Sequence, residues 1–470
     1  MSLHNSIHII GGGISGLYLA LLLSSHNSIK IHVYEKLSFF GGRIQTEYDI
    51  NQNVLYEKGP WRIHPSHKKI IDLIDKLGLE KKEIRQQIYN DFVKNGKKES
   101  DTKFRNQITE YQKWCLEQNI QNANEQMLET GYDMLLQRAN GTRAYSYKTF
   151  EDTDRFFVLE KGFYSIITCL VNKLKQCKNV FLHTNHHVTD ISFKNSIYEI
   201  TMQIRTEQNF KTKCVKTKCI VFAVPPHVIR DWKSLTLYPN TSMISSLPLI
   251  HVYGKLENEQ KWNQNHEKQI VNSPISQIIA STFGNKWFQI SYASGRFAMM
   301  LQNLALVGKK TFDTYILQEW SKFRKGRANI SNIKSYFWRH AVHYWNPNLK
   351  SSEKNMMERC IQPHPKKYPN LYWIGEAVST KQGWMEGAIE TSIQVYHDLT
   401  SPNSQKKINT KLPKEYVIYD GRILNVEKWK LVHPGSREAI ENHLGEDITE
   451  LWNMYHPKEA SKYMVLLEQL

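Results

Sequence analysis

Four residues near the N-terminus have the types and spacing needed to hold a dinucleotide. Gly11, Gly13 and Gly16 form a G-x-G-x-x-G pattern, and Glu35 follows at the end of the next apolar stretch. The first glycine permits a tight turn, the second lets the backbone approach a diphosphate, and the third lets a helix pack closely on a strand. A carboxylate about 20 residues further on can accept hydrogen bonds from both ribose hydroxyls. The sequence therefore predicts a dinucleotide site lined by Gly11, Gly13, Ile14, Ser15, Gly16, Glu35 and Lys36.

A strand, a helix and a second strand are needed to place these residues. Residues 8–10 are an apolar run typical of a strand, residues 17–23 favour a helix, and residues 29–34 alternate as a second strand. The N-terminus of the helix would then face the phosphates with its partial positive charge. A glycine pattern alone is weak support, but its place between a strand and a helix makes an ordinary glycine-rich loop a poor alternative.

The segments that follow resemble the flavin-containing amine oxidase family. That family has an E-x-x-x-R-x-G-G-R stretch after the second strand, matched here by residues 35–43, and then a small-residue turn, matched by residues 57–62. Phe39 replaces the first arginine of the stretch, whereas Arg43 keeps the second. The resemblance implies that the dinucleotide is FAD and that it contacts Gly42, Arg43, Gly59, Pro60 and Trp61.

Further motifs of the same family recur downstream in the same order. Residues 187–191 match a segment whose Val188 would contact the adenine through its backbone. Members that attach the flavin covalently use a cysteine upstream of the closing signature, and residues 340–345 contain none, so the resemblance implies non-covalent FAD. Residues 372–377 and 382–388 resemble that closing signature. The resemblance implies that the flavin and its ribityl chain are contacted by Gly375, Glu376, Gly383 and Met385.

Arg62 and Trp384 indicate the substrate class. Residues 59–62 resemble the turn of L-amino-acid oxidases in which an arginine clamps the substrate carboxylate, although Trp61 stands where that branch has methionine. A guanidinium suits a carboxylate because it can donate two parallel hydrogen bonds. Trp384 matches an aromatic position on the flavin face, and Tyr344 or Trp345 is a candidate for the opposite wall. The alternatives are an Arg62 that faces phosphate or solvent, with a monoamine or polyamine as substrate, and a core role for Tyr344.

His251 occupies the position at which many members of the family carry a lysine near flavin N5. It lies in the strand-like segment 249–253. We therefore predict that His251 and Trp384 are the catalytic side chains, while the cofactor accepts the hydride. The alternative is a buried histidine with a structural role.

The C-terminal residues form a separate module. Residues 401–414 are rich in Ser, Pro, Asn, Gln and Lys and predict a linker, and residues 416–426 predict a hairpin with Asp-Gly at its turn. An H-P-G triplet, a G-x-D-x-T stretch and a second histidine follow in the order seen in cytochrome b5. That resemblance implies haem b held by His433 and His456 from both sides of the iron, an arrangement suited to electron transfer. Ser436 replaces a glycine of the family, so a module without haem is the alternative.

These features predict three kinds of domain. We expect an α/β FAD-binding domain of the Rossmann-like, glutathione-reductase type, a discontinuous α+β substrate domain with a helical insertion, and a small α+β cytochrome b5-like domain. Inside the insertion, residues 111–116 and 127–136 have apolar residues near the helical period. The expected boundaries are 1–84, 156–230 and 346–400 for FAD binding, 85–155 for a helical substrate cap, 231–345 for the substrate domain, 401–414 for the linker and 415–470 for the haem module.

Composition favours an intracellular, soluble protein. The six cysteines show no C-x-x-C pairing, which is typical of a reducing compartment such as the cytoplasm. The sequence contains no run of 18 uninterrupted apolar residues, so we predict no transmembrane segment. A net charge of +17 would attract nucleic acid or anionic membranes, but the charge is scattered and no nucleic-acid-binding motif accompanies it. We expect a solvated basic surface and no specific nucleic-acid partner.

The resemblance implies an enzyme that oxidises an amine, with an L-amino acid as the expected substrate. Hydrolysis of the imine product would release ammonia. The electrons would pass to oxygen, giving hydrogen peroxide, or to a redox partner such as the C-terminal haem. Two alternatives remain: a monoamine or polyamine oxidase of the same fold, and a non-catalytic flavin-binding protein that docks a partner.

Overall fold

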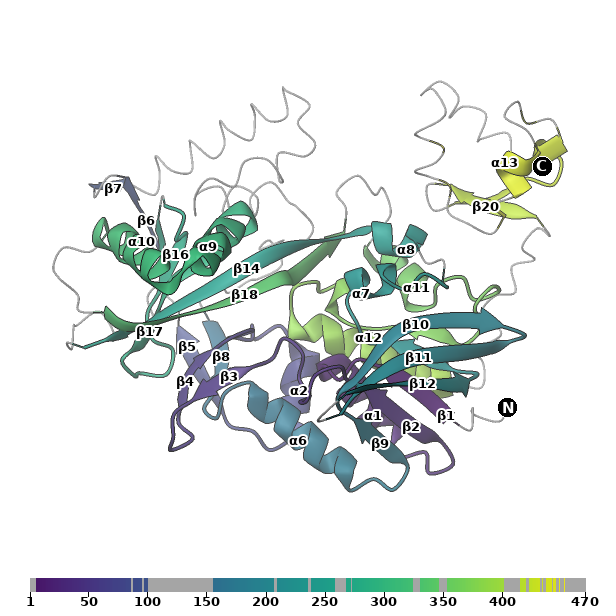
Figure 1. Ribbon diagram of the computed structural model, residues 1–470, viewed down its shortest axis with the longest axis horizontal. Helices are drawn as coiled ribbons and strands as arrows, with labels where there is room; N and C mark the ends of the chain where they lie inside the picture. The colour runs from purple at the N-terminus through teal and green to yellow at the C-terminus, as the bar shows by residue number, and fades with distance from the viewer. Residues whose placement is uncertain are drawn as a thin grey trace.

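A computed structural model of the chain gives the arrangement of both modules (Figure 1). It describes residues 6–85, 88–94, 97–99, 155–206, 209–235, 238–257, 268–271, 273–323, 330–345, 353–400, 415–419, 422–431, 433, 437–441, 443–444, 448 and 452.

A five-stranded parallel sheet forms the centre of the first domain. Every pair of neighbouring strands in it is parallel, and strands of this kind, covered on both faces, are nearly continuous apolar runs. The first strand is such a run, because its last four residues are all buried. In spatial order the strands are β19 (Leu371–Trp373), β13 (Ile220–Phe222), β1 (Ser6–Ile10), β2 (Lys30–Tyr34) and β9 (Val180–His183).

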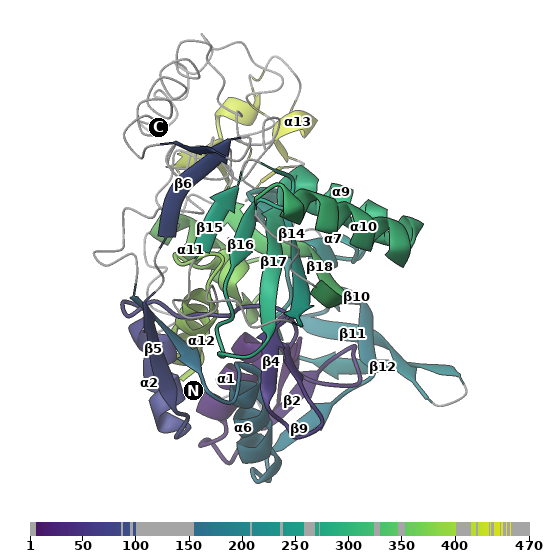
Figure 2. The ribbon, with the colours of Figure 1, turned by 90° about the vertical axis from the view of Figure 1, so that its left-hand side faces the viewer.

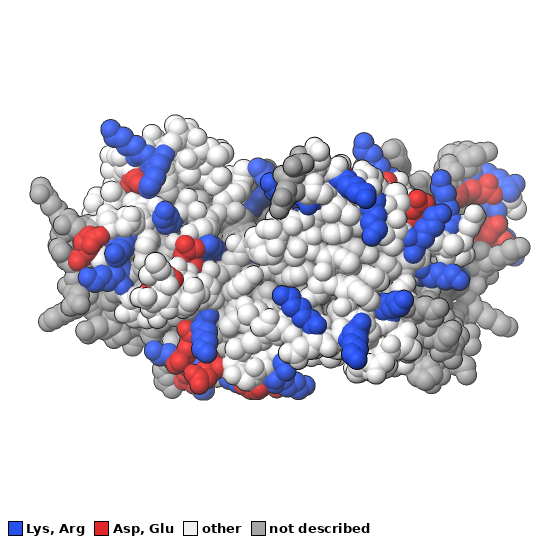
Figure 3. All heavy atoms as spheres, turned by 60° about the horizontal axis from the view of Figure 1, so that its bottom comes forward, with Lys and Arg blue, Asp and Glu red and all other residues white. Residues whose placement is uncertain are grey.

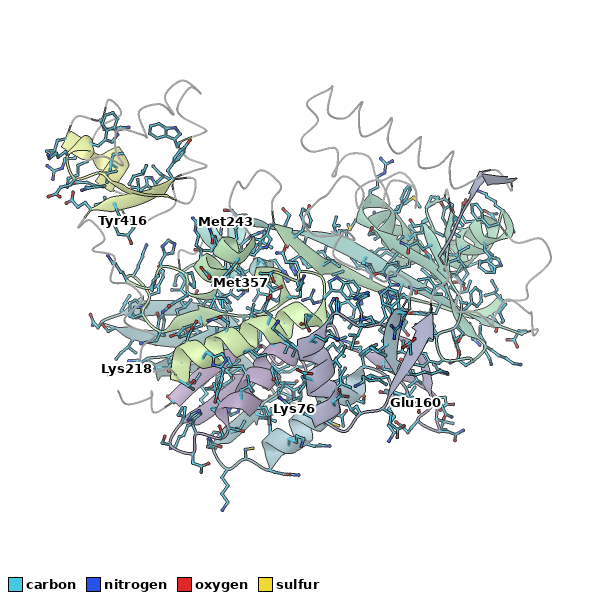
Figure 4. The ribbon with its side chains drawn as sticks, turned by 180° about the vertical axis from the view of Figure 1, so that it is seen from behind. Lys76, Glu160, Lys218, Met243, Met357 and Tyr416 are labelled. Atoms are coloured by element: carbon cyan, nitrogen blue, oxygen red, sulfur yellow. The ribbon has the colours of Figure 1, made fainter. Side chains whose placement is uncertain are left out.

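Each face of this sheet packs on a different layer. Successive side chains of a strand point to opposite faces, so Ile9 joins one hydrophobic core and Ile10 the other. Three helices cover the first face: α1 (Ile14–Leu23), α6 (Tyr164–Lys175) and α12 (Met385–Thr400). Figure 4, which views the molecule from behind, shows α12 most clearly. An antiparallel sheet covers the second face: β10 (His186–Lys194), β11 (Ile197–Arg205) and β12 (Phe210–Thr217).

A seven-stranded sheet forms the second domain, and two long antiparallel strands tie it to the first. These strands, β14 (Ile244–Leu256) and β18 (Ile330–Trp345), run from the short helix α8 (Tyr238–Ser242) across the molecule to β17 (Figures 1 and 2). The helices α9 (Gly295–Val307) and α10 (Lys309–Ser321) pack on this sheet. The other strands are β17 (Trp287–Ser294), β16 (Gln277–Ile279), β15 (Lys268–Val271), β6 (Ile88–Lys94) and β7 (Lys97–Glu99).

The predicted helical cap over residues 85–155 is wrong in its first part. Residues 88–94 and 97–99 are strands, and β6 joins the seven-stranded sheet by pairing in parallel with β15. The sequence of β6 is I-Y-N-D-F-V-K, whose aromatic and β-branched residues favour a strand. The Gln- and Lys-rich surroundings had indicated a helix. Residues 100–154, including the stretches 111–116 and 127–136, lie outside the described part of the chain.

Shorter elements connect the two sheets. The strands β3 (Thr46–Tyr48) and β4 (Val54–Glu57) form one antiparallel pair, and β5 (Lys81–Arg85) and β8 (Arg155–Leu159) form another. Between them lie α2 (Lys68–Lys76) and the turn at residues 59–64. The remaining elements of this body are α7 (Pro226–Arg230), α11 (Glu353–Ile361) and the single turn η4 (Glu376–Val378).

The C-terminal module has its own small core. The predicted hairpin is present as β20 (Tyr416–Tyr419) paired with β21 (Arg422–Asn425), followed by η5 (Trp429–Leu431) and α13 (Glu438–Glu441). Figure 4 labels Tyr416 at its start, and the Lys366 ammonium lies 5.0 Å from the centre of that ring. The buried residues of this core are Val417, Leu424, Val426, Ile440, Ile448 and Trp452.

On the face drawn in Figure 3, Lys and Arg side chains lie singly among uncharged residues or beside acidic ones. Within the described residues no helix is long and apolar enough to cross a membrane.

Candidate active site

The three glycines of the first turn have different roles. A Cβ at Gly11, where φ is +113°, would lie 2.4 Å from the carbonyl oxygen of Ala223, and one at Gly16 would lie 2.2 Å from that of Gly11. These two glycines are therefore required by packing within the protein. A Cβ at Gly13 would meet nothing within 4 Å. Gly13 also caps the N-terminus of α1 without a side-chain hydrogen bond, so open space lies where a phosphate would be held.

Glu35 is fixed beside this turn. Its Oε2 accepts a hydrogen bond from the Gly12 N–H at 3.0 Å, and its Oε1 accepts one from the Leu37 N–H at 2.9 Å. Burial raises the pKa of Glu35, while these two donors act in the opposite direction. Each carboxylate oxygen keeps a second lone pair, which can accept a ribose hydroxyl.

The predicted adenine contact lies close to Glu35. The His186 N–H donates to the Glu35 carbonyl oxygen at 2.8 Å, which places the start of β10 at the end of β2. Val188, two residues further on, is buried, and its carbonyl oxygen accepts a long hydrogen bond of 3.4 Å from Trp232 Nε1. Lys36 is exposed on the other side of Glu35.

Three further segments surround the open space at Gly13. The Gly41 N–H donates to the Gly12 carbonyl at 2.9 Å, and a Cβ at Gly42 would come within 3.7 Å of the Gly13 Cα. On the other side, a Cβ at Gly375 would come within 3.9 Å of Ser15 Oγ. Segments that are far apart in the sequence thus form a glycine-lined cradle, and the residues present fit a dinucleotide.

Glu376 is the centre of a charged network beside this cradle. Its Oε1 lies 2.7 Å from Arg43 Nη2 and 2.5 Å from His343 Nδ1, and its Oε2 accepts the Gly383 N–H at 2.8 Å. Burial alone would raise the pKa of Glu376, but Arg43 and His343 together lower it to about 2. Arg43 Nη1 also donates to the Ala341 carbonyl at 2.5 Å. Glu376 is therefore a carboxylate that holds two basic side chains in place.

Arg62 lies in an aromatic setting next to the predicted flavin turn. A Cβ at Gly59 would lie 1.9 Å from the Arg43 carbonyl oxygen, so this turn packs directly on the cradle. The Arg62 guanidinium lies 4.6 Å from the Trp61 ring centre and 4.0 Å from that of Phe156. Only 9% of Arg62 is exposed. Contacts with two ring faces fix the plane of the guanidinium, which is the geometry needed to present parallel N–H donors.

Trp384 joins the same aromatic group. Together with Tyr292 it packs against a buried cluster that includes Trp61 and Phe156. Its ring also meets His67 edge to face, with centres 4.7 Å apart. The structure thus brings together the predicted residues Trp61, Arg62 and Trp384. Met385, the next residue, is buried at the start of α12.

His251 lies on β14 near this group. Its ring meets Tyr292 edge to face with centres 5.0 Å apart, and its Nδ1 lies 3.0 Å from Gln289 Nε2 and 3.3 Å from the Tyr253 hydroxyl. Burial lowers the pKa of His251 to about 3, so the imidazole is neutral at pH 7. Tyr253 and Gln289 also line a small cavity that reaches Trp61.

Tyr344 is placed differently from Trp384. It is buried at the end of β18, opposite Ser245 of β14, and lies outside the aromatic cluster formed by the described residues. Its two sequence neighbours contact the closing signature. His343 contacts Glu376, and the Trp345 N–H donates to Gln382 Oε1 at 2.8 Å. Sequence reasoning missed His343, because it considered residues 340–345 only for a flavin-linking cysteine and for an aromatic wall residue.

The C-terminal module presents one of its two predicted haem ligands. The His433 ring lies 6.1 Å from that of Trp429, edge to face. His456 lies outside the described residues. In the part of the chain that the structure describes, no three His, Cys, Asp or Glu side chains are arranged so that they could hold a metal ion.

Comparison with known proteins identifies the family. Residues 14–128 and 90–395 match the model of the flavin-containing amine oxidoreductases, and residues 402–468 match that of the cytochrome b5-like heme/steroid binding domain. The chain therefore belongs to the flavin-containing amine oxidoreductase family and carries a cytochrome b5-like domain toward its C-terminal end.

Individual relatives match over short stretches. The chain is 35% identical over 94 residues to an L-amino-acid oxidase of Echis ocellatus, which covers 20% of this chain and 18% of that protein. It is 46% identical over 44 residues to a Delta 8-(E)-sphingolipid desaturase of Lachancea kluyveri, which covers 9% of this chain and 8% of that protein. The chain thus spans less than a fifth of the length of these curated relatives.

The fold extends over much more of the chain. A solved structure of a putrescine oxidase variant has a TM-score of 0.61 and 15% sequence identity, covering 84% of this chain and 98% of the other. This likeness shows a shared fold.

Proposed function

We propose that this protein is an FAD-dependent oxidase of amino acids. The observation that carries the proposal is the position of Arg62, whose guanidinium contacts the rings of Trp61 and Phe156, both in the aromatic group that Trp384 joins. A guanidinium with a fixed plane next to an apolar wall suits a small molecule that joins a carboxylate to an amine. The sequence match to the L-amino-acid oxidase of Echis ocellatus supports this substrate class.

The cradle around Gly13 suits the diphosphate of FAD. Glu35 would accept the ribose hydroxyls, Val188 would approach the adenine, and the Gly59 turn would lie under the flavin. FAD supplies the two-electron acceptor for the carbon–hydrogen bond next to the amine. The residues of the chain bind and orient this group and exclude water from it.

Three side chains would act on the substrate. Arg62 would hold the carboxylate by two hydrogen bonds, and Trp384 would restrict the amine to one orientation. His251, neutral at pH 7, would accept a hydrogen bond from the amine without adding a second positive charge beside Arg62. The amine loses a hydride and a proton to become an imine, and water hydrolyses the imine to a carbonyl compound and ammonia.

The C-terminal module adds a second redox centre to the proposal. Two histidines of the cytochrome b5 pattern, His433 and His456, would hold haem b without an open coordination position, which favours electron transfer. Molecular oxygen is the other acceptor, and it would give hydrogen peroxide.

Substitution of Arg62 tests the substrate class. In Arg62→Gln we expect kcat/KM for the most active amino acid of a panel to fall about a hundredfold, because a buried, hydrogen-bonded charge partner is worth about 2–5 kcal/mol. Arg62→Lys should recover little, because an ammonium cannot donate the two parallel bonds. The exposed Arg205→Gln, at the end of β11, serves as the control, and flavin content should stay constant in all three. Unchanged amino-acid turnover in Arg62→Gln would reject the carboxylate clamp and favour an amine substrate without a carboxylate.

A further inference from the structure

Three histidines, one of which contacts Glu376, lie close together and have no part in the proposed chemistry. His340 of β18 stacks on His227 of α7, with ring centres 3.8 Å apart and planes inclined by 16°. His343 lies further along β18 and contacts Glu376 through Nδ1. Ser246 holds His340 through a hydrogen bond of 2.7 Å to its Nδ1. Three imidazoles from two elements thus form one group.

Two nitrogens of this group lack partners. His343 Nε2 and His227 Nδ1 are enclosed by protein and have no hydrogen-bond partner among the described residues. Buried polar atoms are nearly always paired, so an orphaned pair in one place indicates a ligand that the protein binds there. Glu376 does not fill this need: it bonds Arg43, Nδ1 of His343 and the Gly383 N–H, and makes no hydrogen bond to His343 Nε2 or His227 Nδ1.

The charge of the surroundings indicates an anion. Lys36 and Arg43 both act electrostatically on His227, and Arg43, Arg230 and Arg339 act on His340. Burial and these neighbours lower the pKa of His227 to about 3, so the group resists further positive charge until an anion arrives. The first turn of α1 contains no acidic residue that could supply this negative charge.

The histidines lie next to the segments that form the cradle: His227 is on α7, and β18 meets the cradle through His343, which contacts Glu376, and Ala341, whose carbonyl accepts from Arg43. Arg43 directly follows Gly42, Glu376 directly follows Gly375, and α7 follows Ala223, whose carbonyl packs on Gly11. We propose that His343, donating Nδ1–H to Glu376 and Nε2–H to a diphosphate oxygen as an imidazolium, holds the diphosphate of the bound dinucleotide. The stacked pair His227–His340, Arg43 and the N-terminus of α1 hold it from the other sides. This inference rests on the proposed binding of FAD and assigns to it three residues that no motif marks.

Two isosteric variants separate the nitrogens of His343. The amide of His343→Asn can replace Nδ1 and keep the bond to Glu376, whereas that of His343→Gln can replace Nε2. FAD affinity is measured by equilibrium fluorescence of the purified holoprotein on dilution, and ADP and riboflavin serve as displacing probes. We expect a Kd for FAD raised about tenfold to a hundredfold in His343→Asn and less in His343→Gln, because a charge-assisted hydrogen bond is lost in the first.

The two probes distinguish diphosphate from flavin. Affinity for ADP should fall by the same factor as affinity for FAD, and affinity for riboflavin should not change. His227→Phe keeps the stacked ring but removes its nitrogens, so it provides a second test if the His343 variants fold poorly. The exposed His397→Leu is the matched control.

The inference is overturned if His343→Asn and His227→Phe bind FAD and ADP as tightly as the wild type does. It is also overturned if the variants lose affinity for riboflavin alone. A wild-type protein that purifies without FAD and does not take it up would instead reject the proposed function itself.

Discussion

Arg43 and Glu376 form an ion pair of 2.7 Å that joins the N-terminal cradle to the closing signature. The carboxylate is 7% exposed and the guanidinium 34%, so the pair is largely shielded from water on one side. It also fixes His343 and the backbone of Gly383. A single carboxylate therefore aligns two halves of the proposed cofactor site.

Replacement of Glu376 by Gln should destabilise the protein. Removing one partner of a buried pair leaves the others unpaired, which costs about 3 kcal/mol. The native pKa of about 2 lies below the usual value of 4.5, so the carboxylate stabilises the fold above pH 4.5 and this contribution is lost as the pH falls toward 2. Urea unfolding at pH 7 measures the difference, with the exposed Glu358→Gln as control. A change below about 1 kcal/mol would contradict the role of Glu376.

The glycines of the first turn offer a matched pair of substitutions. Gly13→Ala should fold with near-native stability, because φ is −75° and its Cβ would meet no protein atom. It should nevertheless weaken FAD binding, because the methyl group enters the open space. Gly16→Ala should lower stability, since its Cβ would lie 2.2 Å from the Gly11 carbonyl oxygen. Thermal unfolding and flavin titration report the two effects separately, and the reverse pattern would exclude the cradle.

Three buried histidines should make the fold sensitive to acid. Burial lowers the pKa values of His8, His67 and His251 to about 3 each, against 6.5 in the unfolded chain. Between pH 6.5 and 3 these histidines bind protons in the unfolded state but not in the native state. The free energy of unfolding therefore falls as the pH drops below 6.5. Each group contributes about 1.4 kcal/mol between pH 7.5 and 5.5, or about 4 kcal/mol for the three together.

Urea unfolding at pH 7.5 and 5.5 measures this loss. His8→Asn, which can keep the hydrogen bond from Nδ1 to the Tyr34 hydroxyl, should reduce it by about a third. Equal stability of the wild type at both pH values would show that these imidazoles are protonated in the native state.

His433→Ala should abolish haem binding and leave the flavin in place. The module has its own core around Val417 and Trp452, separate from the cores of the FAD-binding domain. The Soret absorbance of reconstituted protein measures haem, and released FAD provides the internal control. A wild-type protein without a Soret band after reconstitution would show that the module binds no haem.

The sequence predicted those parts of the fold that depend on local pattern. The strand, turn and helix around Gly13 are local, and the structure confirms their order. Strand β6 was missed, because its partner β15 is almost two hundred residues away and composition alone indicated a helix. His343 was missed for a similar reason, since its significance depends on contacts with Glu376 and with segments that only the tertiary fold brings near.

Anaerobic reduction of the flavin tests the central claim most directly. The substrates should be matched pairs that differ only by the α-carboxylate, such as L-ornithine with putrescine and L-phenylalanine with phenethylamine. We predict that in at least one pair the amino acid bleaches the flavin absorbance about a hundredfold faster than its amine, because only the amino acid has a carboxylate that can accept hydrogen bonds from Arg62. If the amines bleach the flavin as fast as the amino acids, or if no amino acid bleaches it at all, the protein is not an amino-acid oxidase.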